Sequence, residues 1–147
     1  MKIKRMNLQD YSKVYHLWLY TSGMGLNTMD DSEAGIGKYL RRNPNTCFVA
    51  EKKEEIIGAI LSGHDGRRGL IYHLAVKDSE RKRGIGSALL DRALEALQEE
   101  GIKKVYIMIF KNNEAGNAFW EKRGFIVPED VQYRAKEIAP LSHMIIR

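Results

Sequence analysis

The sequence predicts one mixed α/β domain, and three observations support this fold class. Short apolar runs rich in β-branched residues, typical of buried strands, recur along the 147 residues. Between them lie segments whose apolar residues repeat at helical spacing. No linker, repeat or low-complexity segment interrupts the chain, so we expect a single domain over residues 1–147.

The first third of the chain predicts a strand followed by two helices. Residues Lys2–Arg5 form the strand, and Asn7 is expected to cap the first helix, whose apolar residues between positions 8 and 19 share one face. After a loop, Asp30-Asp31-Ser32 can cap the second helix, which Asn43-Pro44 would end.

The middle of the chain predicts three strands and the longest helix. Residues 46–51 and 56–62 read as an antiparallel hairpin, and a glycine-rich charged turn at residues 63–69 leads into a third apolar run, Leu70–Val76. Helical spacing then starts at Ile85, and Gly101 is a natural residue at which this helix would end.

The last third predicts further strands around a fourth helix. Residues 103–110 are strongly apolar and predict a buried strand, after which Asn112-Asn113 can cap the helix. Residues 125–127 and 131–138 predict two more strands, the second at a sheet edge; residues 141–147 have no assigned structure. The total is six to seven strands and about four helices.

Composition limits the classes of function. Hydrophobic content of 44% and charged content of 29% are ordinary for a soluble globular protein. No apolar run is long enough to cross a membrane or to form a signal-peptide core, so we expect a cytoplasmic protein without membrane contact. The net charge of +5 attracts polyanions, but no basic stripe with interleaved aromatics indicates nucleic acid as a partner.

The cysteine and histidine residues do not predict a metal site. Cys47 is the only cysteine, which excludes an intrachain disulfide and a multi-cysteine metal site, and its apolar neighbours suggest a buried strand residue. The four histidines are scattered without ligand spacing.

A glycine-rich basic segment, Arg81 to Ser87, separates the Leu70–Val76 strand from the longest helix. Gly84 and Gly86 let the backbone approach a ligand closely, and the helix start leaves amide N–H groups unpaired at the positive end of the macrodipole. This arrangement suits a pyrophosphate or another polyanion. An ordinary turn with a solvated basic run is the alternative interpretation.

Two motifs resemble a known family. The order strand, V-x-x-x-x-R-x-x-G-x-G, helix, here Val76 to Gly86, resembles the acyl-CoA-binding segment of the GNAT superfamily of N-acetyltransferases. Residues 113–125 resemble the second signature of that superfamily. The matching residues there are Asn113, Lys122, Gly124 and Phe125, whereas Gly116 replaces an alanine and Trp120 replaces the usual tyrosine.

The resemblance implies a fold and an activity. The expected fold is a central, mixed, mostly antiparallel twisted sheet of six to seven strands flanked by about four helices. The expected activity is direct transfer of the acetyl group of acetyl-CoA, without a metal, to a primary amine of a small molecule, peptide or protein. Residues 21–31 would form an acceptor wall. A GNAT-fold module that binds acyl-CoA without turnover is the alternative, and a homodimer stays open because family members are often dimers.

The same resemblance suggests site residues. Those expected to bind acetyl-CoA are Leu74, Ala75, Val76, Arg81, Lys82, Arg83, Gly84, Ile85, Gly86, Ser87, Asn113 and Trp120. Strand alternation would place Leu70, Tyr72, Leu74 and Val76 on one face, and Ile71, His73 and Ala75 on the other.

For catalysis, Tyr72 is the preferred polar residue, because it lies on the face where the family often has a glutamate. Trp120 either hydrogen-bonds the sulfur or packs in the core. The ordinary pKa of a histidine suits a base better than that of a tyrosine, but alternation turns the His73 side chain to the other face of the strand. Tyr133 is a further candidate.

Overall fold

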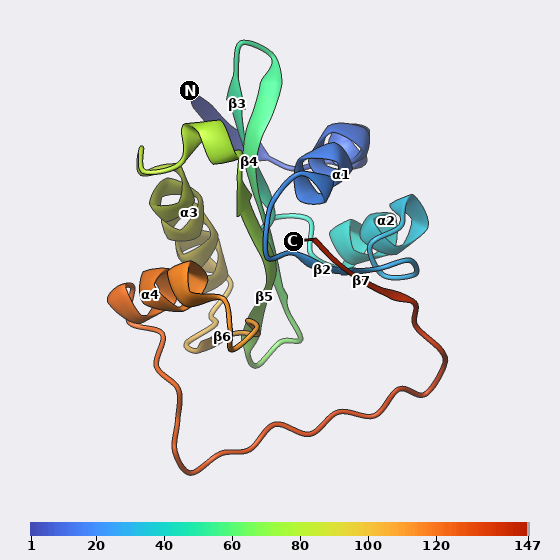
Figure 1. Cartoon of the computed structure of the whole chain (residues 1–147), viewed down its shortest axis with the longest axis vertical. Helices are drawn as coiled ribbons and strands as arrows, with labels where there is room; N and C mark the ends of the chain where they lie inside the picture. The colour runs from blue at the N-terminus through green and yellow to red at the C-terminus, as the bar shows by residue number, and fades with distance from the viewer. Residues whose placement is uncertain (147) are drawn as a thin grey trace.

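The elements of the chain alternate between strand and helix, as Figure 1 shows for the computed structural model, which describes residues 1–146. Seven strands and four α-helices confirm the expected mixed class within these residues. The strands are β1 (Lys2–Arg5), β2 (Gly25–Asn27), β3 (Phe48–Lys52), β4 (Glu55–His64), β5 (Gly69–Val76), β6 (Val105–Ile107) and β7 (His143–Ile145). The helices are α1 (Tyr11–Leu19), α2 (Glu33–Arg42), α3 (Ile85–Glu99) and α4 (Glu114–Lys122), with 3-10 turns η1 (Leu8–Asp10) and η2 (Asp78–Glu80).

The main sheet has five strands in the order β1-β3-β4-β5-β6. All neighbours are antiparallel except β5 and β6, which run parallel. Helices α1 and α2 cover one face, and α3 and α4 cover the other (Figure 1). The expected mixed, mostly antiparallel sheet is therefore confirmed, with the strands β2 and β7 forming a second sheet of their own.

Capping side chains explain where three of the helical segments begin. Asn7 accepts a hydrogen bond from the Gln9 amide at 2.9 Å, and its own amide donates to Asp10 Oδ2 at 3.0 Å. Ser32 caps α2 and Asn113 caps α4, each accepting from the amide three residues on. Because each cap satisfies amides that the helix leaves unpaired, these starts were predictable from sequence.

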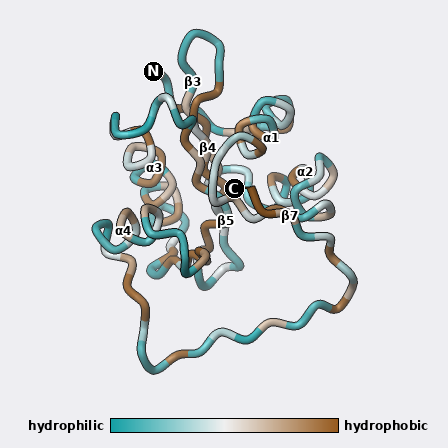
Figure 2. Tube along the Cα trace, viewed as in Figure 1, coloured by the Kyte–Doolittle hydropathy of each residue, from teal (hydrophilic) through white to brown (hydrophobic). Residues whose placement is uncertain are grey.

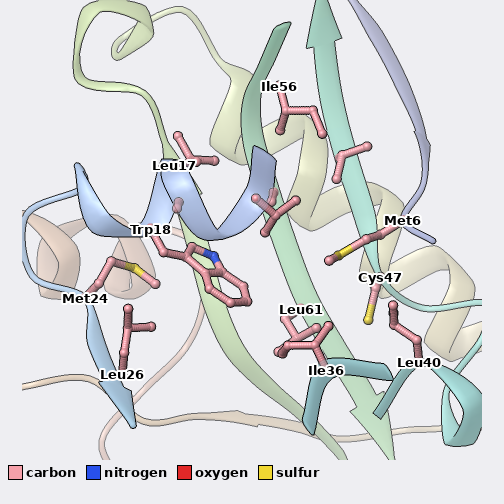
Figure 3. Packing of buried hydrophobic residues seen from close by; sticks show 14 residues of the cluster. Met6, Leu17, Trp18, Met24, Leu26, Ile36, Leu40, Cys47, Ile56 and Leu61 are labelled. Carbon is pink, nitrogen blue, oxygen red and sulfur yellow. The ribbon is translucent and has the colours of Figure 1, made fainter. Parts of the chain in front are cut away.

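Two apolar clusters hold the helices against the sheet. Figure 3 shows the cluster under α1 and α2, in which Trp18, Leu61 and Ile36 come from α1, β4 and α2. On the opposite face, α3 packs closely on β4, since a Cβ built at Gly58 would lie 2.9 Å from Leu89 Cδ1. Within residues 1–146, none of the helices combines the length and the apolar character that crossing a membrane requires.

The expected alternation of side chains along β5 is wrong at Tyr72. Leu61 pairs with His73 and Ser62 pairs with Ile71, so Tyr72 is the extra residue of a β-bulge. The Tyr72 ring therefore packs against Tyr39 of α2, with the centroids 5.6 Å apart. The next ring, His73, packs against Trp18 of α1 at 4.8 Å, so both side chains lie on the α1–α2 face.

The last third of the chain departs most from the sequence prediction. Residues 126–142, here called the C-terminal arm, contain no strand, so the strands expected at 125–127 and 131–138 are wrong. Figures 1 and 2 show the arm extended away from the sheet, with apolar and polar positions intermixed. A strand exists only where a neighbour accepts its backbone hydrogen bonds, and residue alternation does not supply that neighbour.

Two neighbouring segments also differ from expectation. Residues 103–110 contain only the three-residue strand β6, which lies at the sheet edge with Tyr106 46% exposed rather than buried. The tail, which had no assigned structure, supplies β7, and β7 pairs antiparallel with Gly25–Asn27, a segment expected to be partly loop.

We predict that trypsin cuts first within the arm, after Arg134. The arm side chains are exposed, Ile138 to 96%, and no backbone hydrogen bond within residues 1–146 holds residues 126–141. Mass spectrometry of early fragments would locate the cut, and Arg134→Gln should slow it. A first cut within α3 or β4 would contradict this prediction.

Candidate active site

The sheet opens between β5 and β6. Parallel pairing joins only Gly69–Ile71 to Val105–Ile107, and β5 then continues to Val76 with β4 as its one strand neighbour. The Lys77 amide donates to Ile57 O of β4 at 2.8 Å. Because strand amides alternate in direction, those of Leu74 and Val76 point toward the open edge. This edge therefore offers two hydrogen-bond donors to a ligand.

The turn after β5 brings a helix start to the same opening. Lys82 and Gly84 have φ of 64° and 80°, in the left-handed region that glycine adopts most readily. The first intrahelical bond runs from the Ala88 amide to Gly84 O at 3.0 Å, and no side chain caps α3. The first amides of α3, beginning at Ile85, thus have no carbonyl partner, which favours an anion.

Two of the three cations of this turn, Arg81 and Arg83, form ion pairs. Arg81 lies 3.1 Å from Asp78, and Arg83 lies 3.1 Å from Glu80. A hydrogen bond from Lys52 is the main cause that lowers the pKa of Glu80, which keeps this carboxylate charged. Within residues 1–146 only Lys82 of the three has no ion pair, so the attraction for an anion rests on Lys82 and the free amides.

Gly86, in the first turn of α3, packs between the end of β5 and α4. A Cβ built at Gly86 would have ordinary contacts only, 3.6 Å to Val76 Cγ2 and 3.8 Å to Phe119 Cε1. The packing of the protein itself therefore does not require glycine at this position.

Trp120 and Asn113 both make structural contacts. The Trp120 ring lies 5.1 Å from Phe119 and 4.9 Å from Phe125, within the cluster between α3 and α4. Asn113 caps α4, and a Cβ at Gly23 would lie 2.9 Å from Asn113 Nδ2. Of the two alternatives for Trp120, the contacts support packing. The chain between α1 and β2 lies against the start of α4.

Polar groups gather on the α1–α2 side of the opening. Tyr72 is 45% exposed, and its pKa is raised first by burial, then by the charge of Asp30 and by Tyr133. Tyr72 lies on β5 and Asp30 in the β2–α2 turn, which the Asp31–His73 contact joins to β5, so two segments distant in the sequence contribute to this surface. The Asp30 carboxylate also accepts from Asn27 Nδ2 at 3.0 Å.

A buried carboxylate–imidazole pair lies beneath this surface. His73 Nε2 and Asp31 Oδ1 are 2.8 Å apart, and their side chains are 9% and 6% exposed. The second Asp31 oxygen accepts from the Asn27 amide at 2.8 Å, and Tyr11 donates to the Asp31 carbonyl at 2.7 Å. Sequence reasoning missed this pair, because the two residues are 42 positions apart and no local pattern signals their contact.

Cys47 is not a nucleophile at neutral pH. Burial raises the pKa of its thiol to about 12, and Sγ donates to Ser62 O at 3.1 Å. This agrees with the expectation of a small buried strand residue.

Comparison with known proteins agrees with the geometry. A sheet that opens beside an uncapped helix start can hold a long carrier with an anionic end. Residues 10–125 match the model of the acetyltransferase (GNAT) family. An acetyltransferase of Pectobacterium atrosepticum is 34% identical over 122 residues, covering 83% of this chain and 85% of its own. One of Sodalis glossinidius is 31% identical over 138 residues, covering 94% and 96%.

Solved structures show the same fold. The PaiA N-acetyltransferase of Thermoplasma acidophilum, solved with coenzyme A, has a TM-score of 0.77 at 16% identity and covers 98% of both chains. Ard1 of Thermoplasma volcanium has a TM-score of 0.71 at 21% identity and covers 86% of this chain and 83% of its own. The fold is that of an acyltransferase. The chain belongs to the GNAT family of acetyltransferases.

We predict that Cys47 reacts with a thiol reagent such as dithionitrobenzoate only after unfolding. A thiol that is buried and protonated cannot attack the reagent. Absorbance at the thionitrobenzoate band, with and without denaturant, measures the two rates. Rapid labelling of the folded protein would contradict the buried position.

Proposed function

We propose that this protein transfers the acetyl group of acetyl-CoA directly to a primary amine of a small molecule, a peptide or a protein. The observation that carries the proposal is the open edge of β5, whose Leu74 and Val76 amides lie beside the uncapped start of α3. One end of this opening suits an anion and the other suits a carbonyl oxygen.

The residues proposed to bind acetyl-CoA line this opening. The pyrophosphate would accept hydrogen bonds from the first amides of α3, with Lys82 supplying unpaired positive charge. The pantetheine chain would lie along the open edge of β5, where a β5 amide would bind the thioester oxygen. The proposed set is Leu74, Ala75, Val76, Arg81, Lys82, Arg83, Gly84, Ile85, Gly86, Ser87, Asn113 and Trp120, and it includes no metal.

The reaction needs a neutral amine and a stabilised oxyanion. An ammonium ion must lose a proton before its nitrogen can attack the thioester carbon. The C–N bond then forms, the carbonyl oxygen gains charge that a β5 amide stabilises, and the C–S bond breaks. The thiolate that leaves needs little help, since an ordinary thiol pKa is near 8.5. Trp120 is therefore not required as an acid, which fits its packed position.

The acceptor is proposed to enter beside Tyr72 and Asp30. The Asp30 carboxylate attracts a cationic amine, and the faces of Tyr72 and Tyr39 add a cation–π surface. Because burial raises the pKa of Tyr72, its hydroxyl stays protonated near neutral pH and contributes to the wall as a hydrogen-bond donor. Residues 21–31, which include Asp30, form the acceptor wall.

A binding module without turnover is the second candidate. The packed Trp120 and the absence of a carboxylate on β5 favour it, because no side chain of that strand matches the family's usual glutamate. Both candidates share the acetyl-CoA site, so turnover distinguishes them.

We predict that Gly84→Asp weakens acetyl-CoA binding at least ten-fold. Losing one charge-assisted hydrogen bond costs about 1.5–3 kcal/mol, and the new carboxylate would repel the pyrophosphate. Gly84→Asn is the matched control, because asparagine also tolerates the left-handed backbone but carries no charge. Calorimetry should give a weaker acetyl-CoA affinity for Gly84→Asp than for Gly84→Asn. Equal affinities would contradict the proposal that the pyrophosphate binds at this turn.

We predict that the protein releases thiol from acetyl-CoA when primary amines are present, and that Asp30→Asn raises KM for cationic amines about two- to five-fold. The effect is modest because exposed charges interact by about 0.2–1 kcal/mol. Glu54→Gln, in the β3–β4 turn, is the matched control and should leave KM unchanged. Acetyl-CoA binding without thiol release across a broad amine and peptide panel would favour the binding module instead.

A further inference from the structure

We infer that the buried Asp31–His73 pair takes up the proton that the acceptor amine loses, through an intervening water. The inference rests on the proposed function and assigns a base to it. Sequence reasoning had left the base open, because alternation turned His73 away from the acceptor side. The bulge moves Tyr72 to the face that His73 occupies, so the α1–α2 face holds both side chains.

The hydrogen bond within the pair selects which ring nitrogen can accept a proton. An ionised carboxylate only accepts hydrogen bonds, so the ring nitrogen 2.8 Å from Asp31 Oδ1, Nε2, carries the hydrogen. Nδ1 of a neutral His73 is then the basic nitrogen, and no side chain or backbone group within residues 1–146 hydrogen-bonds to it. When Nδ1 gains a proton, the adjacent carboxylate stabilises the imidazolium.

The pair lies where the two substrates would meet. His73 directly precedes Leu74, whose amide faces the open edge of β5 proposed to hold the thioester. Asp31 directly follows Asp30, which stands on the acceptor wall. Since the His73 side chain is only 9% exposed, a water must carry the proton from the amine to the ring.

Few other groups near the pair can take this role. Burial raises the pKa of Tyr11 to about 12 and raises those of Tyr39 and Tyr72, so these hydroxyls stay protonated near neutral pH. Trp18, packed against the ring, does not titrate. Beyond these, the charge of Asp30 and the Tyr133 hydroxyl lie near Tyr72, and the imidazole is the one side-chain type here with an ordinary pKa between 5 and 8.

The proton balance closes without another reactant. The ammonium gives one proton through water to Nδ1, the neutral amine attacks, and the nitrogen sheds a second proton to solvent as the C–S bond breaks. The thiolate takes the proton back from the imidazolium. Each turnover thus releases one proton and returns His73 to its neutral form.

The test compares pH profiles of His73→Gln and wild type in thiol release with an alkylamine acceptor. Glutamine can still donate to Asp31 but cannot titrate. We expect kcat/KM to fall about 10²–10⁴-fold at neutral pH. The ratio of wild-type to variant kcat/KM should fall about ten-fold per pH unit as the pH rises toward the amine pKa, because deprotonation by solvent replaces the base. Asp31→Asn should show the same fall.

His64→Gln is the matched control. His64 also pairs with a carboxylate, Glu100 at 3.0 Å, but at the C-terminal end of α3, opposite the glycine turn. It should follow the wild-type profile. Acetyl-CoA affinity of His73→Gln, measured by calorimetry, should match wild type and show that the variant is folded.

The outcomes separate this inference from the proposed function. A loss in His73→Gln that is constant across pH, or no loss, would overturn the base while leaving the transferase intact. Failure of the wild type to release thiol with any amine would overturn both. If neither variant folds, nitrogen NMR of wild-type His73 decides, since hydrogen on Nδ1 rather than Nε2 would overturn the inference.

Discussion

The loss of one strand neighbour beyond Ile71 determines the rest of the site. A strand inside a sheet has its backbone groups paired on both sides, and β5 lacks β6 on one side from Tyr72 onward. Those groups need another partner, which is either water or a ligand. Because the turn to α3 begins at the end of the same strand, unpaired strand amides and unpaired helix amides lie within one opening. This geometry supports the proposal that the opening binds a carbonyl and an anion together, which no side-chain motif could do alone.

The bulge at Tyr72 has a second, independent effect. An unbulged strand would send Tyr72 and His73 to opposite faces, one toward α3 and one toward α1. The extra residue places both on the α1–α2 face, where Tyr72 meets Tyr39 and His73 meets Asp31. In the proposed function, the strand would present its backbone to acetyl-CoA and two consecutive polar side chains to the acceptor. The buried pair also fixes the β2–α2 turn to β5, since Asp31 holds the Asn27 amide as well as the imidazole.

Sequence reasoning succeeded where a residue's partner lies within four positions. The caps at Asn7, Ser32 and Asn113 and the end of α3 at Gly101 depend on amides one turn away, and these were predictable. It failed where the partner lies far along the chain. Neither the bulge nor the pairing of β7 with β2 has a local signal, because each depends on which strand arrives opposite.

The ion pairs between the glycine turn and its acidic neighbours were likewise not predicted from the sequence. The basic run from Arg81 to Arg83 reads as three free cations, but η2 places Asp78 and Glu80 beside two of them. The role of individual site residues stays a prediction for this reason: residue type limits what a side chain can do, whereas the fold decides what it faces.

In the proposed function, the distribution of charge over the opening would place the two substrates at opposite ends. At the α3 end, free amides and Lys82 favour an anion; at the other end, Asp30 stands exposed with Asp31 buried behind it. A carrier with phosphates and a cationic amine would each be attracted to one end and repelled from the other. The neutral backbone of β5 lies between these ends. An amine that reaches this region has left a site that favours its charged form, so a neighbouring group must take its proton before the nitrogen can attack. The Asp31–His73 pair is proposed to lie along that path, since Asp31 follows Asp30 and His73 precedes Leu74.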